Sequence, residues 1–170
     1  MTATSTAPVS FDLALPDPGA TDAFGRSLAE RLEPGDCLLL SGPIGAGKSH
    51  LARAIIRALL DRAGAAEEDI PSPTYTLVQT YEAAGVEIWH ADLYRLSAPD
   101  ELFELGLDAA FDSAICLIEW PDRLGTDAPS DALTIALSPT AGDGRLARLS
   151  GSAGWAGRLA ALQGLEPVAR

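Results

Sequence analysis

The chain has 170 residues, the usual size of one domain. Its 12 basic and 24 acidic residues give a net charge of −12, which argues against an autonomous nucleic-acid binder because such a surface repels phosphate backbones. No apolar run approaches the roughly 20 residues of a membrane span, and the N-terminus lacks the basic cluster and apolar stretch of a secretory signal.

The first third of the chain predicts a strand, a helix and a second strand. Apolar residues alternate over 11–15, which is typical of a short strand. Residues 16–19 (PDPG) predict a turn, and Thr21 is expected to cap a helix with an apolar stripe. The continuous apolar run 37–40 predicts a strand covered on both faces.

The middle of the chain predicts a helix followed by a hairpin. Apolar residues repeat at helical spacing over 51–60, and Gly64 is expected to end that helix. Strands are predicted at 77–81 and 86–91, joined by the turn Ala83–Gly85.

The last third predicts two helices, a buried strand and a second hairpin. A helix is expected from Ser97 to about residue 105, and a strand over 114–118. Residues 132–137 and 146–150 flank a Gly-containing turn, and 155–162 predict an amphipathic helix.

The strongest motif is GPIGAGKS at residues 42–49, which follows a predicted strand and precedes a predicted helix. It fits the P-loop pattern G-x-x-x-x-G-K-[ST]. Its amides and the helix N-terminus suit a phosphate chain, Lys48 suits the β- and γ-phosphate oxygens, and the Ser49 hydroxyl suits Mg²⁺. Lys48 is the only lysine beside 11 arginines, which suggests that arginine cannot replace it there.

These elements predict one domain of the α/β class over residues 10–165. We expect a P-loop NTPase-like three-layer fold, with a mixed sheet that is parallel in its centre and has antiparallel hairpins at its edges. Residues 1–9 are rich in Ser, Thr, Ala and Pro and are expected to be a disordered tail.

A P-loop needs an acid near its metal ion, and two acids end predicted strands. Glu119 and Asp92 are both candidates for holding Mg²⁺ or for orienting the attacking water. Residues 72–76 (SPTYT) predict a loop that senses the γ-phosphate, with a plain connecting loop as the alternative.

Other polar and aromatic residues allow more than one reading. His90 is interpreted as a structural histidine, and Trp120 as a packing residue. Arg95 equally suits a phosphate, a partner or a nearby acid. Cys37 and Cys116 lie in apolar runs and are interpreted as buried thiols, which indicates a reducing cytoplasm.

The class of P-loop protein is narrowed by what the sequence lacks. It has no asparagine, so the Asn-Lys-x-Asp base-recognition motif of Ras-like GTPases is excluded and ATP is favoured. A small-molecule kinase remains an alternative, although no arginine-rich lid is visible between Lys48 and Glu119.

The order and spacing of four blocks closely resemble the TsaE family. These blocks are GPIGAGKS, SPTYTLVQTY, HADLYRL and ELFELGLDAAFDSAICLIEWPDRLG. The resemblance covers about residues 12–150. It implies a small ATPase of bacterial tRNA threonylcarbamoyladenosine (t⁶A) biosynthesis, which works with the two partner subunits of the threonylcarbamoyl-transferase complex.

The resemblance also implies how the chain contacts tRNA and which residues bind the nucleotide. The threonylcarbamoyl-transferase complex modifies adenosine 37 of tRNAs that read ANN codons, so this chain is expected to contact tRNA only through its partners. Lys48, Asp92 and Glu119 are the expected catalytic residues, and Ser49 and Glu119 the expected Mg²⁺ ligands. The expected ATP-binding residues are Gly42, Pro43, Ile44, Gly45, Ala46, Gly47, Lys48, Ser49, His50, Thr74, Asp17 and Arg145.

Two departures from the family pattern stand in the P-loop. The family commonly has Asp-Leu where this chain has Pro43-Ile44, and Thr where it has Ser49.

A competing hypothesis for the function is a nucleotide-gated adaptor, in which ATP binding rather than hydrolysis docks the partner.

Overall fold

The computed structural model describes residues 7–65, 68–98 and 100–163, and within them seven strands form one mixed sheet. The strand order is β1-β7-β6-β2-β5-β4-β3. The neighbours β6, β2, β5 and β4 are parallel, whereas β3, β7 and β1 pair antiparallel at the two edges. The strands are β1 Val9–Leu15, β2 Cys37–Ser41, β3 Val78–Ala83, β4 Val86–Asp92, β5 Ile115–Glu119, β6 Leu133–Pro139 and β7 Arg145–Gly151.

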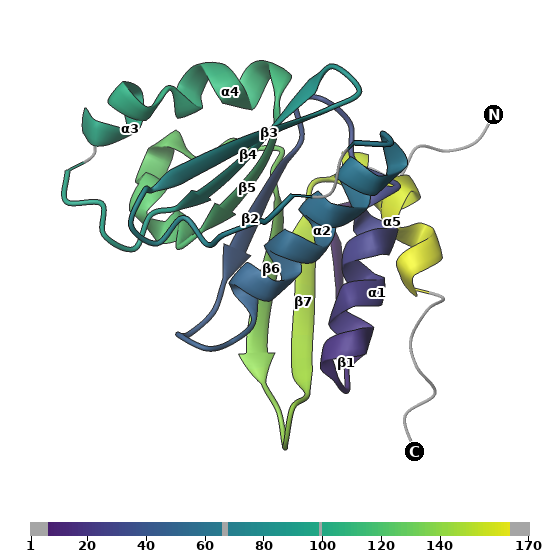
Figure 1. Cartoon of the computed structure of the whole chain (residues 1–170). Helices are drawn as coiled ribbons and strands as arrows, with labels where there is room; N and C mark the ends of the chain where they lie inside the picture. The colour runs from purple at the N-terminus through teal and green to yellow at the C-terminus, as the bar shows by residue number, and fades with distance from the viewer. Residues whose placement is uncertain (1–6, 66–67, 99, 164–170) are drawn as a thin grey trace.

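Helices cover both faces of the sheet and complete three layers, as Figure 1 shows. The core on one face includes residues of α1, α2 and α5, and the core on the other includes residues of α4 and the 3-10 helix η1. This arrangement confirms the predicted fold class. The helices are α1 Pro18–Ala29, α2 Lys48–Arg62, α3 Asp100–Leu105, α4 Leu107–Ser113 and α5 Ala156–Gln163, with 3-10 turns at η1 Pro121–Asp127 and η2 Ala153–Trp155.

The start of α1 differs from its prediction. The helix begins at Pro18, so the residues predicted to form a turn make its cap and first turn instead. Asp17, with φ −152°, accepts a hydrogen bond from the Ala20 amide at 2.8 Å, and Pro18 occupies the first helical position, where a missing N–H costs nothing. Thr21 is therefore a buried residue of the helix and not its cap.

The start of β1 and the presence of α4 also differ from the prediction. Val9 begins β1, although residues 1–9 were predicted to be a tail; residues 1–6 of that tail lie outside the described part. The helix α4 was not predicted because it is short and its buried face consists of only Leu107 and Ala110. Gly106, at φ 84°, separates it from α3.

The two cysteines are buried free thiols, as predicted. Cys37 of β2 pairs in register with Cys116 of β5 in the centre of the sheet. Burial raises the pKa of Cys116 to about 12 and also raises that of Cys37. No helix of the described residues is long and apolar enough to cross a membrane.

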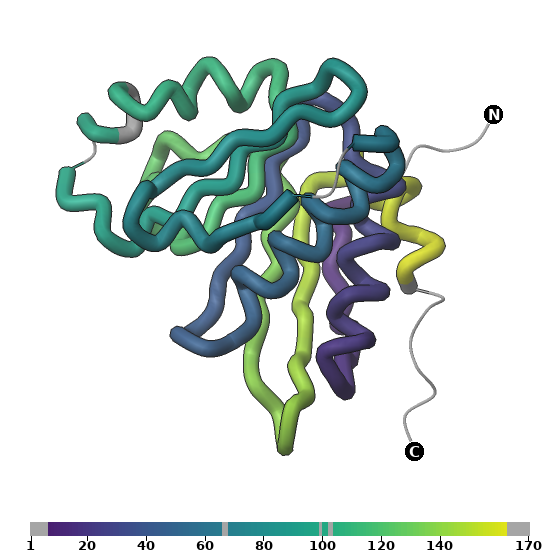
Figure 2. Tube along the Cα trace, viewed as in Figure 1, coloured from purple at the N-terminus to yellow at the C-terminus, as the bar shows by residue number. Residues whose placement is uncertain are grey.

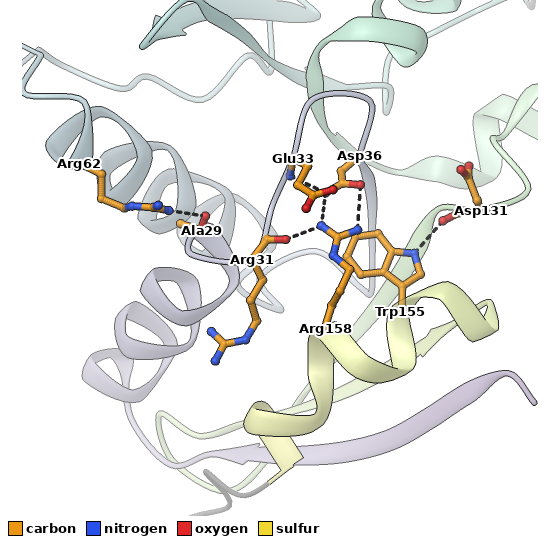
Figure 3. Close-up of polar contacts among 8 residues, drawn as sticks. All are labelled: Ala29, Arg31, Glu33, Asp36, Arg62, Asp131, Trp155 and Arg158. Atoms are coloured by element: carbon orange, nitrogen blue, oxygen red, sulfur yellow. Dashed lines mark hydrogen bonds and ion pairs between the residues drawn. The ribbon is translucent and has the colours of Figure 1, made fainter. Parts of the chain in front are cut away.

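The amino ends of the parallel strands are held by a clamp around Arg158 of α5 (Figure 3). Its guanidinium pairs with Asp36, which precedes β2, and stacks 4.2 Å above the ring of Trp155. The Trp155 indole donates at 2.7 Å to the carbonyl of Asp131, which precedes β6. The clamp therefore fixes α5 against the starts of two central strands.

Candidate functional site

The P-loop connects β2 to α2 at the carboxyl end of the parallel strands. The segment lies at the same end of the sheet as the tip of the β6–β7 hairpin (Figure 2). Gly42 has φ 138°, and a Cβ there would lie 2.3 Å from the carbonyl oxygen of Leu137 in β6. Gly47 has φ 100° and directly precedes α2. Glycine at these positions allows the loop to fold back closely on the sheet.

Lys48 points into this loop. Its Nζ donates to the carbonyls of Gly42 at 2.6 Å and Pro43 at 2.9 Å, and it lies 4.0 Å from the ring centre of Trp120. Burial lowers its pKa, while Glu119 and Asp92 act in the opposite direction. The ammonium is thus held where the loop amides would surround a phosphate chain.

The structure brings Ser49 and Glu119 together across 70 positions of sequence. The Ser49 hydroxyl donates to the Glu119 carboxylate, with Oε1 at 2.8 Å and Oε2 at 3.1 Å. Glu119 is 2% exposed at the end of β5. A serine hydroxyl and a carboxylate are the oxygen ligands that Mg²⁺ takes beside a nucleotide, so this pair fits the predicted metal site.

Asp92 lies beside Glu119 because β4 and β5 are parallel and these two residues are in register. Its Oδ1 accepts from the Tyr94 amide at 3.0 Å. Burial raises the pKa of this carboxyl, and the neighbouring Glu119 adds to that shift. Two carboxylates at adjacent strand ends concentrate negative charge where a divalent cation would be stabilised.

These groups line a cavity of about 430 Å³. Its walls are Ile44, Gly45, Gly47, Lys48, Ser49, His50, Arg53, Thr74, Asp92, Tyr94, Glu119 and Trp120. A larger hollow of about 590 Å³ is lined by residues of α1, α2 and the segment 69–71. Five residues of the P-loop and both strand-end acids line the smaller cavity, which we therefore take as the candidate site.

The protein groups at this site could supply only part of the ligand set of a metal ion. In the part of the chain that the structure describes, no three His, Cys, Asp or Glu side chains are grouped so that they could hold a metal ion. Mg²⁺ commonly uses one or two protein ligands, phosphate oxygens and water. Ser49 and Glu119 fit that smaller set.

The sequence matches the family described as "Threonylcarbamoyl adenosine biosynthesis protein TsaE" over residues 15–147. The chain belongs to the TsaE family. A relative from Rickettsia bellii, named "tRNA threonylcarbamoyladenosine biosynthesis protein TsaE", is 35% identical over 130 residues, which is 76% of this chain and 88% of the relative. A relative of the same name from Rickettsia conorii is 41% identical over 102 residues, 60% of this chain but only 56% of the relative.

A solved structure has the same fold. YdiB from Bacillus subtilis superposes with a TM-score of 0.70 at 22% identity, covering 94% of this chain and 97% of that one. At this identity the likeness concerns the fold alone. It agrees with the three layers and the mixed sheet described above.

Four further residues predicted from the TsaE resemblance divide into two that line the cavity and two that do not. Arg145 donates to the Gly45 carbonyl at 3.2 Å, so it braces the P-loop from β7. Asp17 caps α1, and does not line the cavity. His50 contacts Asp22 of α1 at 2.7 Å while also lining the cavity. Thr74 lines it too, with its hydroxyl 2.8 Å from that of Ser72.

Sequence reasoning missed three features of this TsaE-family site. His90, interpreted as structural, lies 2.6 Å from Glu119. Arg53 lines the cavity one helical turn after Ser49, a spacing that could have signalled it. The Tyr94 ring packs against Trp120 with ring centres 4.9 Å apart and the ring planes tilted by 48°.

The arginine of the HADLYRL block lies over an aromatic ring. Arg95 sits 4.5 Å above the ring centre of Tyr75, which is 80% exposed. This contact does not decide whether Arg95 binds a phosphate, a partner or a nearby acid. It joins the loop after β4 to the predicted γ-phosphate loop.

Proposed function

We propose that this chain binds and hydrolyses ATP with Mg²⁺ as a component of t⁶A biosynthesis. The observation that carries the proposal is the hydrogen bond between Ser49 and Glu119 beside Lys48. A P-loop hydroxyl that contacts a strand-end carboxylate is the arrangement that magnesium–nucleotide binding requires. The family name supports the pathway.

Each residue has a separate role in this proposal. The amides of residues 42–49 and the Lys48 ammonium bind the phosphates, and Ser49 and Glu119 hold the metal. Mg²⁺ bound there neutralises charge on the β- and γ-phosphate oxygens. Asp92 is not bonded to Ser49 among the contacts described, and we assign it to orienting the attacking water.

The net charge of the chain and its family membership support the proposed partners. A chain of net charge −12 is repelled by tRNA, so the transfer to adenosine 37 in tRNAs that read ANN codons is assigned to the two threonylcarbamoyl-transferase subunits. In this proposal the chain works in the cytoplasm with them, and its ATP hydrolysis resets the complex between turnovers.

Phosphate release measured with and without the two partner subunits tests the proposal. We expect hydrolysis that depends on Mg²⁺ and is stimulated by the partners. In Glu119→Gln we expect turnover to fall more than nucleotide affinity does. The control Glu87→Gln alters an exposed carboxylate on β4 and should leave both unchanged.

A non-hydrolysable ATP analogue distinguishes the adaptor hypothesis. If the analogue supports repeated rounds of tRNA modification, binding alone is sufficient and the ATPase proposal is wrong. Phosphate release that requires an added acceptor metabolite would instead indicate a small-molecule kinase.

A further inference from the structure

His90 is the most buried polar side chain near the candidate site. It lies on β4, two residues before Asp92, and is 0% exposed. Its Nε2 is 2.6 Å from Oε2 of Glu119, which is itself 2% exposed. The two residues come from neighbouring strands, 29 positions apart in sequence.

The hydrogen bonds of Glu119 determine which ring nitrogen carries the proton. An ionised carboxylate only accepts hydrogen bonds, and the Ser49 hydroxyl already donates to it. We therefore assign a proton to Nε2 of His90, which donates to Oε2. The other nitrogen, Nδ1, is buried and has no partner among the described residues.

This arrangement is unfavourable for a residue that only packs. An apolar side chain in the same place would remove the cost of burying Nδ1 without a partner. The contact with Glu119 gives the imidazole its polar role. His90 is also one of only two histidines in the chain.

We propose that His90 is a positioning residue, which fixes the orientation of the Glu119 carboxylate for the magnesium–nucleotide complex. The inference rests on the proposed function. Ser49 contacts Oε1 most closely and His90 contacts Oε2, so each oxygen of Glu119 is held by a donor from a different element. Without His90, Oε2 would keep only the longer contact with the Ser49 hydroxyl at 3.1 Å, and the carboxylate would lose its fixed orientation.

The expected size of the effect comes from other metal sites. Removing a group that orients a metal-binding carboxylate typically lowers metal affinity about 10–100-fold. The loss should appear as a smaller gain in nucleotide affinity on adding Mg²⁺. Binding without metal should change little, because His90 does not line the cavity.

Two amide variants provide the test. In His90→Gln the side-chain amide stands the same number of bonds from the backbone as Nε2 and can still donate to Glu119. In His90→Asn it stands one bond short. Affinity for a fluorescent ADP analogue is measured in excess EDTA and in millimolar Mg²⁺, and Mn²⁺ binding is followed by electron paramagnetic resonance.

We expect His90→Gln to keep most of the Mg²⁺-dependent gain and His90→Asn to lose about 10–100-fold of it. A third variant, His90→Phe, removes the donor to Oε2 altogether and should lose the gain as His90→Asn does. The control Ile88→Val alters a buried residue two positions earlier on β4 and should leave the gain intact.

The outcomes separate this inference from the proposed function. If the wild-type chain shows no gain with Mg²⁺, the metal site itself is wrong. If the wild type shows the gain and His90→Asn keeps it as fully as His90→Gln does, the positioning role is wrong while the proposed function stands. The amide pair decides the question even if His90→Phe does not fold.

Discussion

The two ends of the central parallel strands use polar side chains in opposite ways. At the amino ends, Arg158 meets the carboxylate of Asp36 and the face of Trp155, so opposite charges and matched donors stabilise the fold. At the carboxyl ends, Lys48 and Asp92 are buried with pKa values shifted against their charged forms. Trp120 there has φ 57°, a conformation rare for a side chain of its size.

This difference indicates that the polar groups at the carboxyl ends of the strands contribute less to stability than those at the amino ends. Groups arranged to meet a ligand are not fully satisfied by the protein itself, whereas groups that only hold elements together are. Changes at the carboxyl end should therefore cost activity more than stability, and changes at the amino end should do the reverse.

The largest expected effect is that of Lys48→Ala. It should lower ATP turnover about 10²–10³-fold, since removing one donor that stabilises developing charge typically has this effect. Unfolding should change little, because burial already disfavours the ammonium. Turnover and thermal unfolding of the same preparation measure both. A large loss of stability would contradict the comparison.

At the other end, Arg158→Ala should lower the free energy of unfolding by about 2 kcal/mol. It leaves Asp36 largely buried without its partner; the effect is smaller than for a fully buried pair because 26% of the Arg158 side chain is exposed. Urea unfolding measures the loss. The magnesium–nucleotide affinity should not change.

A matched control for Arg158 is Arg148→Ala. Arg148 pairs with Asp12 on the surface, with 64% and 45% of the two side chains exposed. Water already solvates both charges, so little or no change in stability is expected. Equal losses in the two arginine variants would mean that the clamp has no special role.

Asp17→Ala tests whether this residue acts as a helix cap or as a nucleotide contact. Loss of the bond to the Ala20 amide should cost about 1 kcal/mol of stability. Asp17→Asn should retain the cap but remove the charge. If Asp17→Asn weakens ATP binding at unchanged stability, the residue also contacts the nucleotide.

Asp92→Asn is expected to change stability in the opposite direction: the variant gains stability while turnover is lost. The raised pKa means that the folded protein binds this proton more tightly than the unfolded chain does. The carboxylate therefore destabilises the fold increasingly as pH rises through the folded pKa. The free energy of unfolding of the variant should therefore exceed that of the wild type at pH 7.

That gain should vanish below the unfolded pKa of about 3.9, where the wild-type carboxyl is protonated in both states. Thermal unfolding at pH 7 and near pH 3.5 checks the sign. A variant less stable than the wild type at pH 7 would show that Asp92 stabilises the fold, contrary to the comparison of the two ends.

Local patterns in the sequence were enough to predict most elements. The helix after the P-loop, the hairpin of β3 and β4, and the hairpin of β6 and β7 are all present. Their signals lie within neighbouring residues, as apolar spacing and turn residues such as Gly85, at φ 82°. The start of α1 was mispredicted because Pro16–Gly19 suits both a turn and a helix cap.

Local sequence patterns identify the P-loop, the alternation of strands and helices, and the two acids that end strands. The folded chain alone reveals that β1 pairs with β7 at the edge of the sheet, that Ser49 contacts Glu119 and not Asp92, and that His90 contacts Glu119. These partners are far apart along the chain. Local propensities act over a few residues, whereas these contacts exist only once the sheet has assembled and brought remote segments together.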